Sequence, residues 1–577
     1  MTLHHRLLAA VLLIVSVAGL VFPAAAQVVL PAPNQPLQLD RSGFGPQLFL
    51  VSLTEGQVEA LAGLPIAVHA TIARGERYVI SAAPTTADRL TAAGVAFTLL
   101  DADTSGKVYY FVDASDPAAA GLAASFGRII FEEAEELLVA VPADGEAAFV
   151  TDLPAHGVRV ALVSSAALPP GAPFSPPAVP ARAAAADPVI AGLLAQVTES
   201  GLQSLIADLS GERPANVGGS ATILYSRYTF AGPIRSVEQY LYERYVELGL
   251  FPSYVPWTYG GYSGRNVIAD MPGAAHPERI WLVGGHFDST SEVPYSAAPG
   301  ADDNATGTAA ALLIAAALRG QRFDDTIRFV HFSGEEQGMW GSKAYAQALS
   351  YAGVQVMGYL DLDMIGYDGN GDRIMEVHAG TRANSTALAS AFVAANATYS
   401  QGLNIELKTD TANRFSDHSS FWDYGYAAFM AIENFFDDAI ARDRNPWYHT
   451  TSDRLAAVDL GYAVRTARTA LAAAAELAGM ATGPTATPTV TLTPGATPTH
   501  TATLTPLPAS CTEQVANGGF ETTGGWTFAA TATQGGYTTR QAHTGARSAR
   551  LGIAPSAVAL GPVSAEGHGQ ETGSSDD

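Results

Sequence analysis

Residue types that bind metal ions gather in one short stretch of the chain. His286 and Asp288 follow an apolar run at residues 280–283 that is typical of a buried strand, and Asp302 and Asp303 precede an Ala-rich run that predicts a helix. A strand, a polar loop and a helix in this order mark the ligand site of an open α/β sheet. Imidazole nitrogen and carboxylate oxygen are both ligands of zinc. The stretch therefore predicts part of a zinc site.

The remaining ligands of such a site are expected where later strands end. Glu336 and Asp363 each follow an apolar, strand-like run. His449 stands shortly before a segment that predicts a helix, which we expect Asp453 to cap. The resulting set is enough for two zinc ions that share one carboxylate. Its members are His286, Asp303, Glu336, Asp363 and His449.

Five short motifs around these residues occur in an order typical of one enzyme family. They are GGHFDS, PGADDNATG, GEEQG, LDLDMIGY and YHTTSD. In this order they resemble the co-catalytic di-zinc aminopeptidases of metallopeptidase family 28, and the resemblance extends over residues 187–480. It implies an α/β fold of the zinc-exopeptidase type, with an open mixed sheet and helices on both faces.

The resemblance also implies how the ligands are divided between two Zn²⁺ ions per chain. Asp303 bridges both ions, and a cis peptide bond joins it to Asn304. The first site is completed by His286 and Asp363, and the second by Glu336 and His449.

Three further residues receive roles beside the ligands. By resemblance, Glu335 is the general base that takes a proton from the attacking water and later gives it to the leaving amine. Asp288 is expected to hydrogen-bond the imidazole of His286 and fix its tautomer. Tyr448 is a candidate donor to the developing oxyanion. The segment 416–418 is expected to support the site. Structural roles are predicted for His331, His378 and His418.

These residues together predict a secreted zinc-dependent aminopeptidase that hydrolyses N-terminal residues from peptides. An acidic site also suits the free α-amino group of peptide or protein substrates. Two alternatives remain open. The first is a glutaminyl-peptide cyclotransferase on the same scaffold, which holds one zinc, and the second is a non-catalytic, stalked binding protein. Zinc stoichiometry separates the first alternative from the aminopeptidase.

The composition of the chain narrows the class of partner and the compartment. A net charge of −24 argues against nucleic acid as a partner. The single cysteine, Cys511, excludes an intrachain disulfide and a thiolate zinc cluster. Residues 1–26 have a polar start, an apolar core at 7–22 and three alanines, which together predict a cleaved signal peptide. We therefore expect an extracellular protein, either free or held at the cell surface.

Two ferredoxin-like α+β repeats are predicted before the catalytic domain. Residues 47–103 and residues 107–165 both show the order β-α-β-β-α-β, a split βαβ plan. Neither half contains a cluster of metal-ligand residue types. We therefore expect a helper or interaction module, and hypothesise that it is a removable pro-segment or folding aid.

The other parts of the chain are predicted from their composition. A Thr/Pro-rich segment is typical of an extended stalk. The segment after it has the opening strands of a carbohydrate-binding type of β-sandwich but is short for one, so only a weak contact with carbohydrate or cell wall is expected. The predicted parts are a linker (166–186), the zinc peptidase domain (187–480), the stalk (482–509) and an incomplete β-sandwich-like module with a disordered tail (511–577).

Overall fold

A computed structural model of the chain describes residues 35–52, 65–72, 77–168, 185–436, 443–481, 536–538 and 548–550. The chain divides into two compact units, residues 1–485 and residues 486–577. In the second unit, the described residues form one antiparallel pair of strands, β20 (Gly536–Thr538) and β21 (Ser548–Arg550). The predicted signal peptide, the stalk, Cys511 and most of the predicted linker lie outside the described residues.

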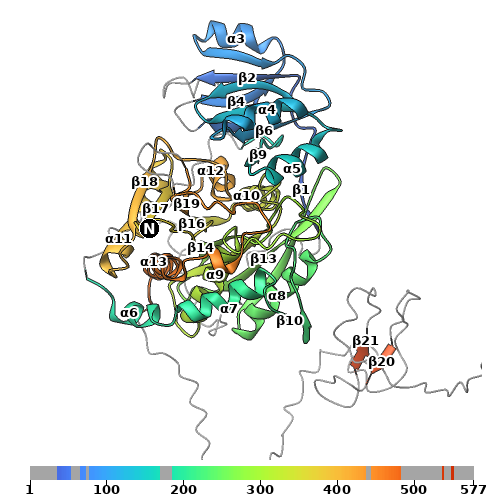
Figure 1. Cartoon of the computed structure of the whole chain (residues 1–577). Coiled ribbons are helices and arrows are strands. Elements are labelled where there is room, and N and C mark those ends of the chain that lie inside the picture. Colours follow the sequence, from blue (N-terminus) through green and yellow to red (C-terminus); the bar gives the residue numbers. More distant parts are fainter. Residues whose placement is uncertain are drawn as a thin grey trace, which may run out of the picture. The chain divides into compact units, whose positions relative to one another are not determined.

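A nine-stranded mixed sheet forms the centre of the first unit (Figure 1). Its strands β14, β15, β16 and β19 run parallel to one another, while β12 and β13 extend one side as an antiparallel pair. In spatial order the strands are β1 (Leu37–Leu39), β12 (Phe251–Tyr259), β13 (Tyr262–Met271), β15 (Asp325–Phe332), β14 (His276–His286), β16 (Gln355–Leu362), β19 (Ala428–Glu433), β17 (Ile374–His378) and β18 (Asn404–Lys408). The predicted α/β class with a large mixed sheet is confirmed.

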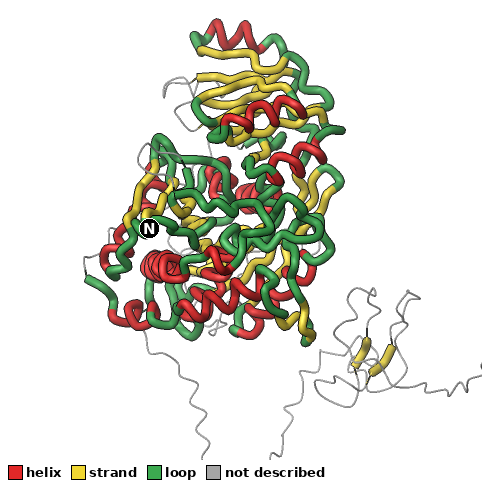
Figure 2. Tube along the Cα trace, viewed as in Figure 1, coloured by secondary structure: helices red, strands yellow, loops and turns green. Residues whose placement is uncertain are grey.

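Helices cover both faces of this sheet (Figure 2). The first face carries α6 (Pro188–Leu194), α7 (Glu199–Leu209), α8 (Ile234–Glu247), α9 (Ala305–Leu318), α11 (Ala383–Thr398) and α13 (Leu460–Ala478). The second face carries α10 (Trp340–Tyr351) and α12 (His418–Asp423). Strand β14 shows why residues 280–283 are all apolar, because Trp281 and Val283 enter the core of the first face whereas Ile280 and Leu282 enter the core of the second.

The catalytic part also contains three short elements. They are the strand pair β10 (Ala215–Val217) and β11 (Ser220–Thr222) and the 3₁₀ turn η3 (Leu455–Ala457). Among the described helices, none is by itself long and apolar enough to cross a bilayer, although α6 and α7, which meet at a 51° bend, reach that length and composition together.

Two four-stranded antiparallel sheets precede the catalytic part, and their strand orders correspond. The first has the order β3-β4-β2-β5 and the second the order β7-β8-β6-β9. The first consists of β2 (Gln47–Ser52), β3 (Ile66–Ile72), β4 (Arg77–Ala82), α3 (Thr86–Ala92) and β5 (Ala96–Asp101). The second consists of β6 (Lys107–Asp113), α4 (Pro117–Phe126), β7 (Arg128–Glu133), β8 (Glu136–Pro142), α5 (Glu146–Ala155) and β9 (Val160–Leu162). The first helix of the order predicted for residues 47–103 falls between β2 and β3, outside the described residues.

The two repeats differ in how they join the catalytic domain. One core packs the sheets of both repeats together, and it includes Met339 and Phe415 of the catalytic domain. The helix side of the first repeat has a small core of its own around Leu90. By contrast, the helix side of the second repeat, with Phe149 and Leu153, belongs to the core that covers the second face of the large sheet. The second repeat is thus packed as part of the catalytic domain.

Candidate metal centre

The parallel strands bring the predicted ligands to one edge of the large sheet. His286 is the last residue of β14, Glu336 follows β15 and Asp363 follows β16. Asp303 directly precedes the Asn304 cap of α9, and His449 lies in the loop after β19. Because the carboxyl ends of neighbouring parallel strands meet at the same edge, residues far apart in the sequence converge there.

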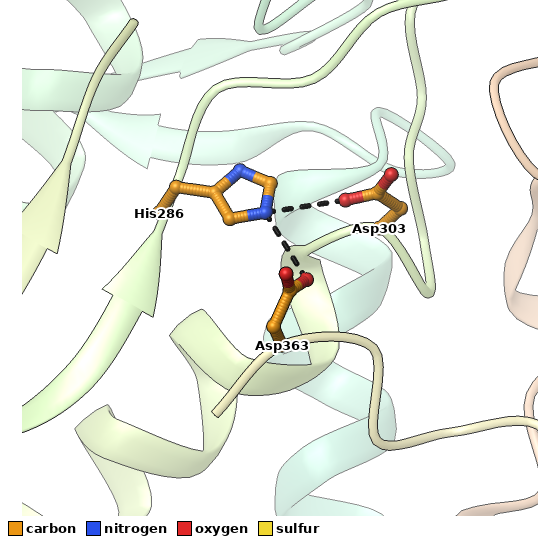
Figure 3. Close-up of side chains that lie close together, drawn as sticks. All are labelled: His286, Asp303 and Asp363. Carbon is orange, nitrogen blue, oxygen red and sulfur yellow. Dashed lines mark hydrogen bonds and ion pairs between the residues drawn. The ribbon is translucent and has the colours of Figure 1, made fainter. Parts of the chain in front are cut away.

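The first group of ligand atoms consists of His286, Asp303 and Asp363, all buried. His286 Nε2 lies 3.3 Å from Asp303 Oδ1 and 3.2 Å from Asp363 Oδ1. Figure 3 shows both contacts converging on the same ring nitrogen. Two ligands of a tetrahedral zinc, each about 2.0–2.2 Å from the ion, lie roughly 3.3 Å apart. The group therefore has the spacing and the atom types of a zinc site.

The second group consists of Asp303, Glu336 and His449, also all buried. His449 Nε2 lies 3.1 Å from Asp303 Oδ2 and 2.8 Å from Glu336 Oε2. Glu336 Oε1 is buried without a hydrogen-bond partner, and His449 Nε2 faces two carboxylate oxygens without hydrogen-bond geometry to either. Buried polar atoms without a hydrogen bond are costly, and a metal ion would satisfy both. The residues present therefore fit zinc.

Asp303 belongs to both groups, with one oxygen turned to each histidine. Burial opposes ionisation of this carboxyl, but the contacts with His286 and His449 outweigh it and lower the pKa of Asp303. Burial likewise opposes a charge on His449, and Glu336 and Asp303 overcome it and raise the pKa of His449 to about 9. The carboxylates thus favour positive charge at this position, which a bound cation can supply. The peptide bond between Asp303 and Asn304 is cis, as the resemblance implies.

Buried hydrogen bonds fix the loop that carries Asp303. The Asp453 carboxylate accepts from the backbone amides of Asp302 and Asp303 at 3.0 Å each. Asn304 Nδ2 donates to the Leu362 carbonyl at 2.9 Å, which ties this loop to the end of β16. A Cβ at Gly307 would lie 2.0 Å from the same carbonyl, so only glycine permits this approach. The expected role of Asp453 was wrong, because it holds this loop while Asp459 caps α13.

Asp288 supports the site differently from the prediction. His286 Nδ1 lies 3.1 Å from the backbone carbonyl of Asp288, whereas its carboxylate is 3.7 Å away, too far for a hydrogen bond. The carboxylate instead accepts from the Thr229 hydroxyl at 2.7 Å and from the Glu335 amide at 3.3 Å. Asp288 therefore positions both the ligand His286 and the backbone of Glu335.

Tyr448 contacts both a ligand and the second repeat. Its ring stacks on His449 with centroids 3.7 Å apart, and its hydroxyl accepts from Arg159 Nε at 3.0 Å. Burial raises the pKa of Tyr448 well above its usual value, although Arg159 opposes the shift. The phenol therefore keeps its proton, and because it accepts from Arg159 that proton can be donated elsewhere.

The second repeat supplies two groups to the site that the sequence did not indicate. The carbonyl oxygen of Pro154, in α5, lies 2.5 Å from His449 Nδ1. Arg159, directly before β9, is 8% exposed and reaches Tyr448. The one feature of the sequence that could have indicated Arg159 is that it is a charged residue within the apolar run at residues 158–163.

The other histidines serve the structure. His331 Nε2 bonds the Tyr245 hydroxyl at 2.7 Å inside the core. His378 bonds Glu376, and His418 bonds the Asn413 carbonyl. In the segment 416–418, the backbone amide of His418 and the Ser416 hydroxyl donate to Asp361, a residue of β16. Among the described residues, none of these three histidines belongs to a metal-ligand group.

The part of the chain that holds both ligand groups is similar to known peptidases. Residues 266–474 match the family described as Peptidase family M28. A probable zinc metalloprotease of Pyricularia oryzae is 32% identical over 248 residues, which is 37% of this chain and 49% of that protein. A probable leucine aminopeptidase of Trichophyton verrucosum is 30% identical over 224 residues, which is 37% of this chain and 56% of that protein. The chain spans about half the length of these curated relatives.

Solved structures with a similar fold include an aminopeptidase, LapA of Legionella pneumophila. The similarity covers 65% of this chain and 99% of that one, with 20% sequence identity and a TM-score of 0.49.

Proposed function

The chain belongs to peptidase family M28 through residues 266–474, and from this premise we propose that it is a zinc-dependent aminopeptidase that removes N-terminal residues from peptides. The observation that carries this proposal is the shared carboxylate of Asp303, which turns one oxygen to His286 and the other to His449. Such an arrangement suits two ions about 3.5–4 Å apart, the spacing of co-catalytic hydrolase sites. Two zinc ions per chain are therefore part of the proposal.

Glu335 is the residue we assign to proton transfer. Zinc supplies Lewis acidity, which polarises the peptide carbonyl and makes a water molecule a better nucleophile. Glu335 stands next to Glu336 in the sequence, outside both ligand groups, and Asp288 holds its backbone amide. Burial raises the pKa of the Glu335 carboxyl, which favours holding a proton. Glu335 then takes the proton of the attacking water and passes it to the leaving amine.

Tyr448 is proposed to donate to the oxyanion as the carbonyl is attacked. The basis is its position beside His449 and its hydroxyl, which accepts from Arg159 and so has its own proton free to donate. The carboxylates of Glu335 and Asp363 are proposed to attract the free α-ammonium of the substrate, which favours an aminopeptidase over an endopeptidase.

Export completes the proposed role. Residues 1–26 have the pattern of a signal peptide, so we propose that the enzyme acts on peptides or proteins with free N-termini outside the cell.

The test uses the full chain with aminoacyl-p-nitroanilides, before and after treatment with a zinc chelator. We expect hydrolysis that the chelator abolishes and added Zn²⁺ restores. Glutaminyl peptides are included in the same assay, because cyclisation without hydrolysis, by protein that holds one zinc per chain, would establish the cyclotransferase instead. A zinc-loaded protein that performs neither reaction would support the non-catalytic alternative.

A further inference from the structure

The second repeat contacts the loop at residues 444–449 of the catalytic domain through one short segment, residues 154–159. Three contacts join the two, and they connect Pro154 to His449, Gly157 to Arg444, and Arg159 to Tyr448. The loop carries a proposed zinc ligand, His449, and the proposed oxyanion donor, Tyr448. The repeat therefore contacts both a metal ligand and a residue assigned to the reaction.

Arg159 has a fixed position in this segment. Its guanidinium donates to the Phe415 carbonyl at 3.4 Å and to the Met364 sulfur at 3.1 Å. Its central carbon lies 4.1 Å from the centre of the Phe435 ring and 5.0 Å from that of Phe436. Packing on these sides leaves few alternative rotamers, so this side chain can hold its hydrogen-bond partner in one place.

The hydroxyl of Tyr448 has Arg159 as its one hydrogen-bond partner among the residues that the structure describes, 3.0 Å from Nε. An arginine N–H can only donate, so the phenol oxygen is the acceptor and the phenol proton is not used in this contact. A hydroxyl proton turns to suit its partners, so the contact with Arg159 decides where this proton can point. Linked hydrogen bonds also polarise one another, which makes a phenol that accepts from a cation a stronger donor.

Tyr448 lies on the path by which a substrate carbonyl would reach the candidate metal centre. Its ring stacks on the ligand His449, and both residues line a cavity of about 400 Å³ between the second repeat and the catalytic domain. Burial raises the pKa of Tyr448 and Arg159 opposes the shift, whereas Asp303 and Glu336 raise it further. The phenol is therefore within electrostatic reach of two ligand carboxylates, and a carbonyl that approaches them through this cavity passes beside it.

We propose that Arg159 is a positioning residue of the peptidase reaction, which fixes the Tyr448 hydroxyl so that its proton is available to the oxyanion. Arg159 does not touch the substrate and acts through Tyr448 alone. As the carbonyl is attacked, its oxygen gains negative charge and accepts a hydrogen bond from the phenol, which keeps its proton throughout. The inference rests on the proposed aminopeptidase function and goes beyond it by assigning the second repeat a part in catalysis.

The first measurement is steady-state hydrolysis of leucyl-p-nitroanilide by the zinc-loaded full chain. Arg159→Met should lower kcat about 10–100-fold, less than the roughly 10²–10³-fold that loss of an entire oxyanion donor costs, and should change KM by less than about threefold. The zinc content should equal that of the wild type, because none of the hydrogen bonds described for Arg159 is with a ligand.

A double-mutant cycle shows whether Arg159 acts through the phenol. Tyr448→Phe should lower kcat about 10²–10³-fold, and adding Arg159→Met should lower it by no more than about twofold further, because the hydroxyl is already gone. If the two effects multiply, Arg159 acts elsewhere and the inference is wrong. A loss of kcat in Tyr448→Phe without one in Arg159→Met overturns the inference alone. A wild-type kcat in Tyr448→Phe refutes the proposed oxyanion role, and the inference with it.

Arg414→Met is the matched control, because Arg414 is also a buried arginine that joins the catalytic domain to the second repeat. It is 7% exposed, pairs with Glu136 and lies 4.1 Å from the centre of the Phe111 ring. None of its contacts among the described residues is with Tyr448. Arg414→Met should lower the free energy of unfolding but leave kcat within about twofold of the wild type. An equal loss of kcat in both variants would show a general structural role and contradict the inference.

Ligand binding tests the inference without turnover. The α-aminophosphonate analogue of leucine carries a tetrahedral anion like that of the transition state, whereas L-leucinol has the same side chain and amine without that charge. By calorimetric titration of the zinc-loaded protein, Arg159→Met and Tyr448→Phe should each weaken binding of the phosphonate about tenfold or more, and that of leucinol by less than about twofold. Equal weakening of both compounds in Arg159→Met would overturn the inference.

Arg159→Lys takes the place of Arg159→Met if that variant does not fold. The lysine keeps a charged donor but lacks the planar fork of the guanidinium, so its kcat should lie between those of the wild type and Tyr448→Phe. In the Tyr448→Phe background the same substitution should have no further effect. A separate effect of the lysine in that background, at full zinc content, would refute an action through Tyr448.

Discussion

The two halves of the candidate metal centre share one carboxylate but differ in what supports them. In the group with His286, the second ring nitrogen of the imidazole contacts the carbonyl of Asp288, within the same loop. In the group with His449, the second ring nitrogen contacts the carbonyl of Pro154, which belongs to the second repeat. Such outer contacts orient a ligand histidine and set its tautomer. One half of the centre is therefore built by the catalytic domain alone, and the other half depends on the segment before it.

The same difference separates the two repeats, although their strand orders correspond. The second repeat places α5 in the core of the catalytic domain and so reaches the site, whereas the helix side of the first repeat encloses its own small core. The two repeats therefore differ in role, because the catalytic domain covers the helix side of the second repeat but not that of the first. The shared core also bears on the hypothesis of a removable pro-segment, since removal of the second repeat would expose that core and withdraw the Pro154 carbonyl from His449.

The largest effect on kcat is expected at Glu335, which belongs to neither half of the centre. Glu335→Gln should lower kcat about 10²–10⁴-fold, because an amide cannot accept the proton, while KM and the zinc content stay near those of the wild type. Glu336→Gln is the contrasting variant, since it should weaken zinc binding only in the half that contains His449. Steady-state kinetics and elemental analysis of both variants check this. Near-normal kcat in Glu335→Gln would mean that the two roles are assigned the wrong way round.

The next effect tests whether zinc affinity in the half with His449 depends on the second repeat. Phe149 is fully buried in α5, the helix that carries Pro154, and its replacement by Ala should cost about 3–5 kcal/mol in free energy of unfolding. As α5 loosens, zinc affinity in the half with His449 should fall by about 10–100-fold, and the other half should not change. Zinc titration against a competing chelator measures both affinities.

Leu90→Ala in the first repeat is the control for this variant, because Leu90 is also fully buried but lies in the separate core. It should destabilise the first repeat by about 2–5 kcal/mol and leave both zinc affinities unchanged. If Leu90→Ala lowers zinc affinity as much as Phe149→Ala does, the two repeats do not differ in their support of the site.

A smaller effect concerns pH and His69, a buried histidine of the first repeat that contacts the second repeat. Burial lowers the pKa of His69 to about 4, and its ring bonds the Ser164 carbonyl and the Ser81 hydroxyl. The folded pKa is below the unfolded value of about 6.5, so this stability is complete above that pH and is lost as pH falls from about 6.5 towards 4. At pH 5 the loss should be about 2 kcal/mol.

Hydrogen exchange, corrected for its intrinsic pH dependence, should show this loss in β3 and β4. His69→Asn should remove the dependence. Unchanged protection in these strands at pH 5 would contradict the assignment.

The smallest effect is expected at the surface between the repeats. Arg77 of the first repeat pairs with Glu133 of the second, and both side chains are partly exposed. Arg77→Gln should change the free energy of unfolding by no more than about 1 kcal/mol and leave kcat/KM unaltered. Denaturant unfolding and a standard assay check this. A larger loss of activity would show that the first repeat also reaches the site.

Local features of the sequence predicted most of the centre, because three of the five ligands stand where an apolar run ends. The parallel strands β14, β15 and β16 then place His286, Glu336 and Asp363 at one edge. Contacts between distant segments could not be predicted in this way. Arg159 reaches Tyr448, 289 residues away, only because the second repeat packs on the catalytic domain.

Asp453 shows the same limit, because its local pattern predicts a helix cap that distant residues prevent. An Asp before a helical segment has the local pattern of a cap, yet the amides of Asp302 and Asp303, some 150 residues earlier, compete successfully for its carboxylate. The peptide NH groups in the Asp303 loop are buried and need an acceptor, and this tertiary demand outweighs the local preference.

Zinc stoichiometry of Asp303→Ala tests the shared centre most directly. Elemental analysis of the purified wild type should give two zinc ions per chain, with aminopeptidase activity in the same preparation. Asp303→Ala should lose both ions, because the two halves share this carboxylate. Asp363→Ala and Glu336→Ala should each retain one ion. A folded Asp303→Ala protein that keeps one firmly bound zinc, or an active wild type that holds only one, would contradict a centre built on a shared carboxylate.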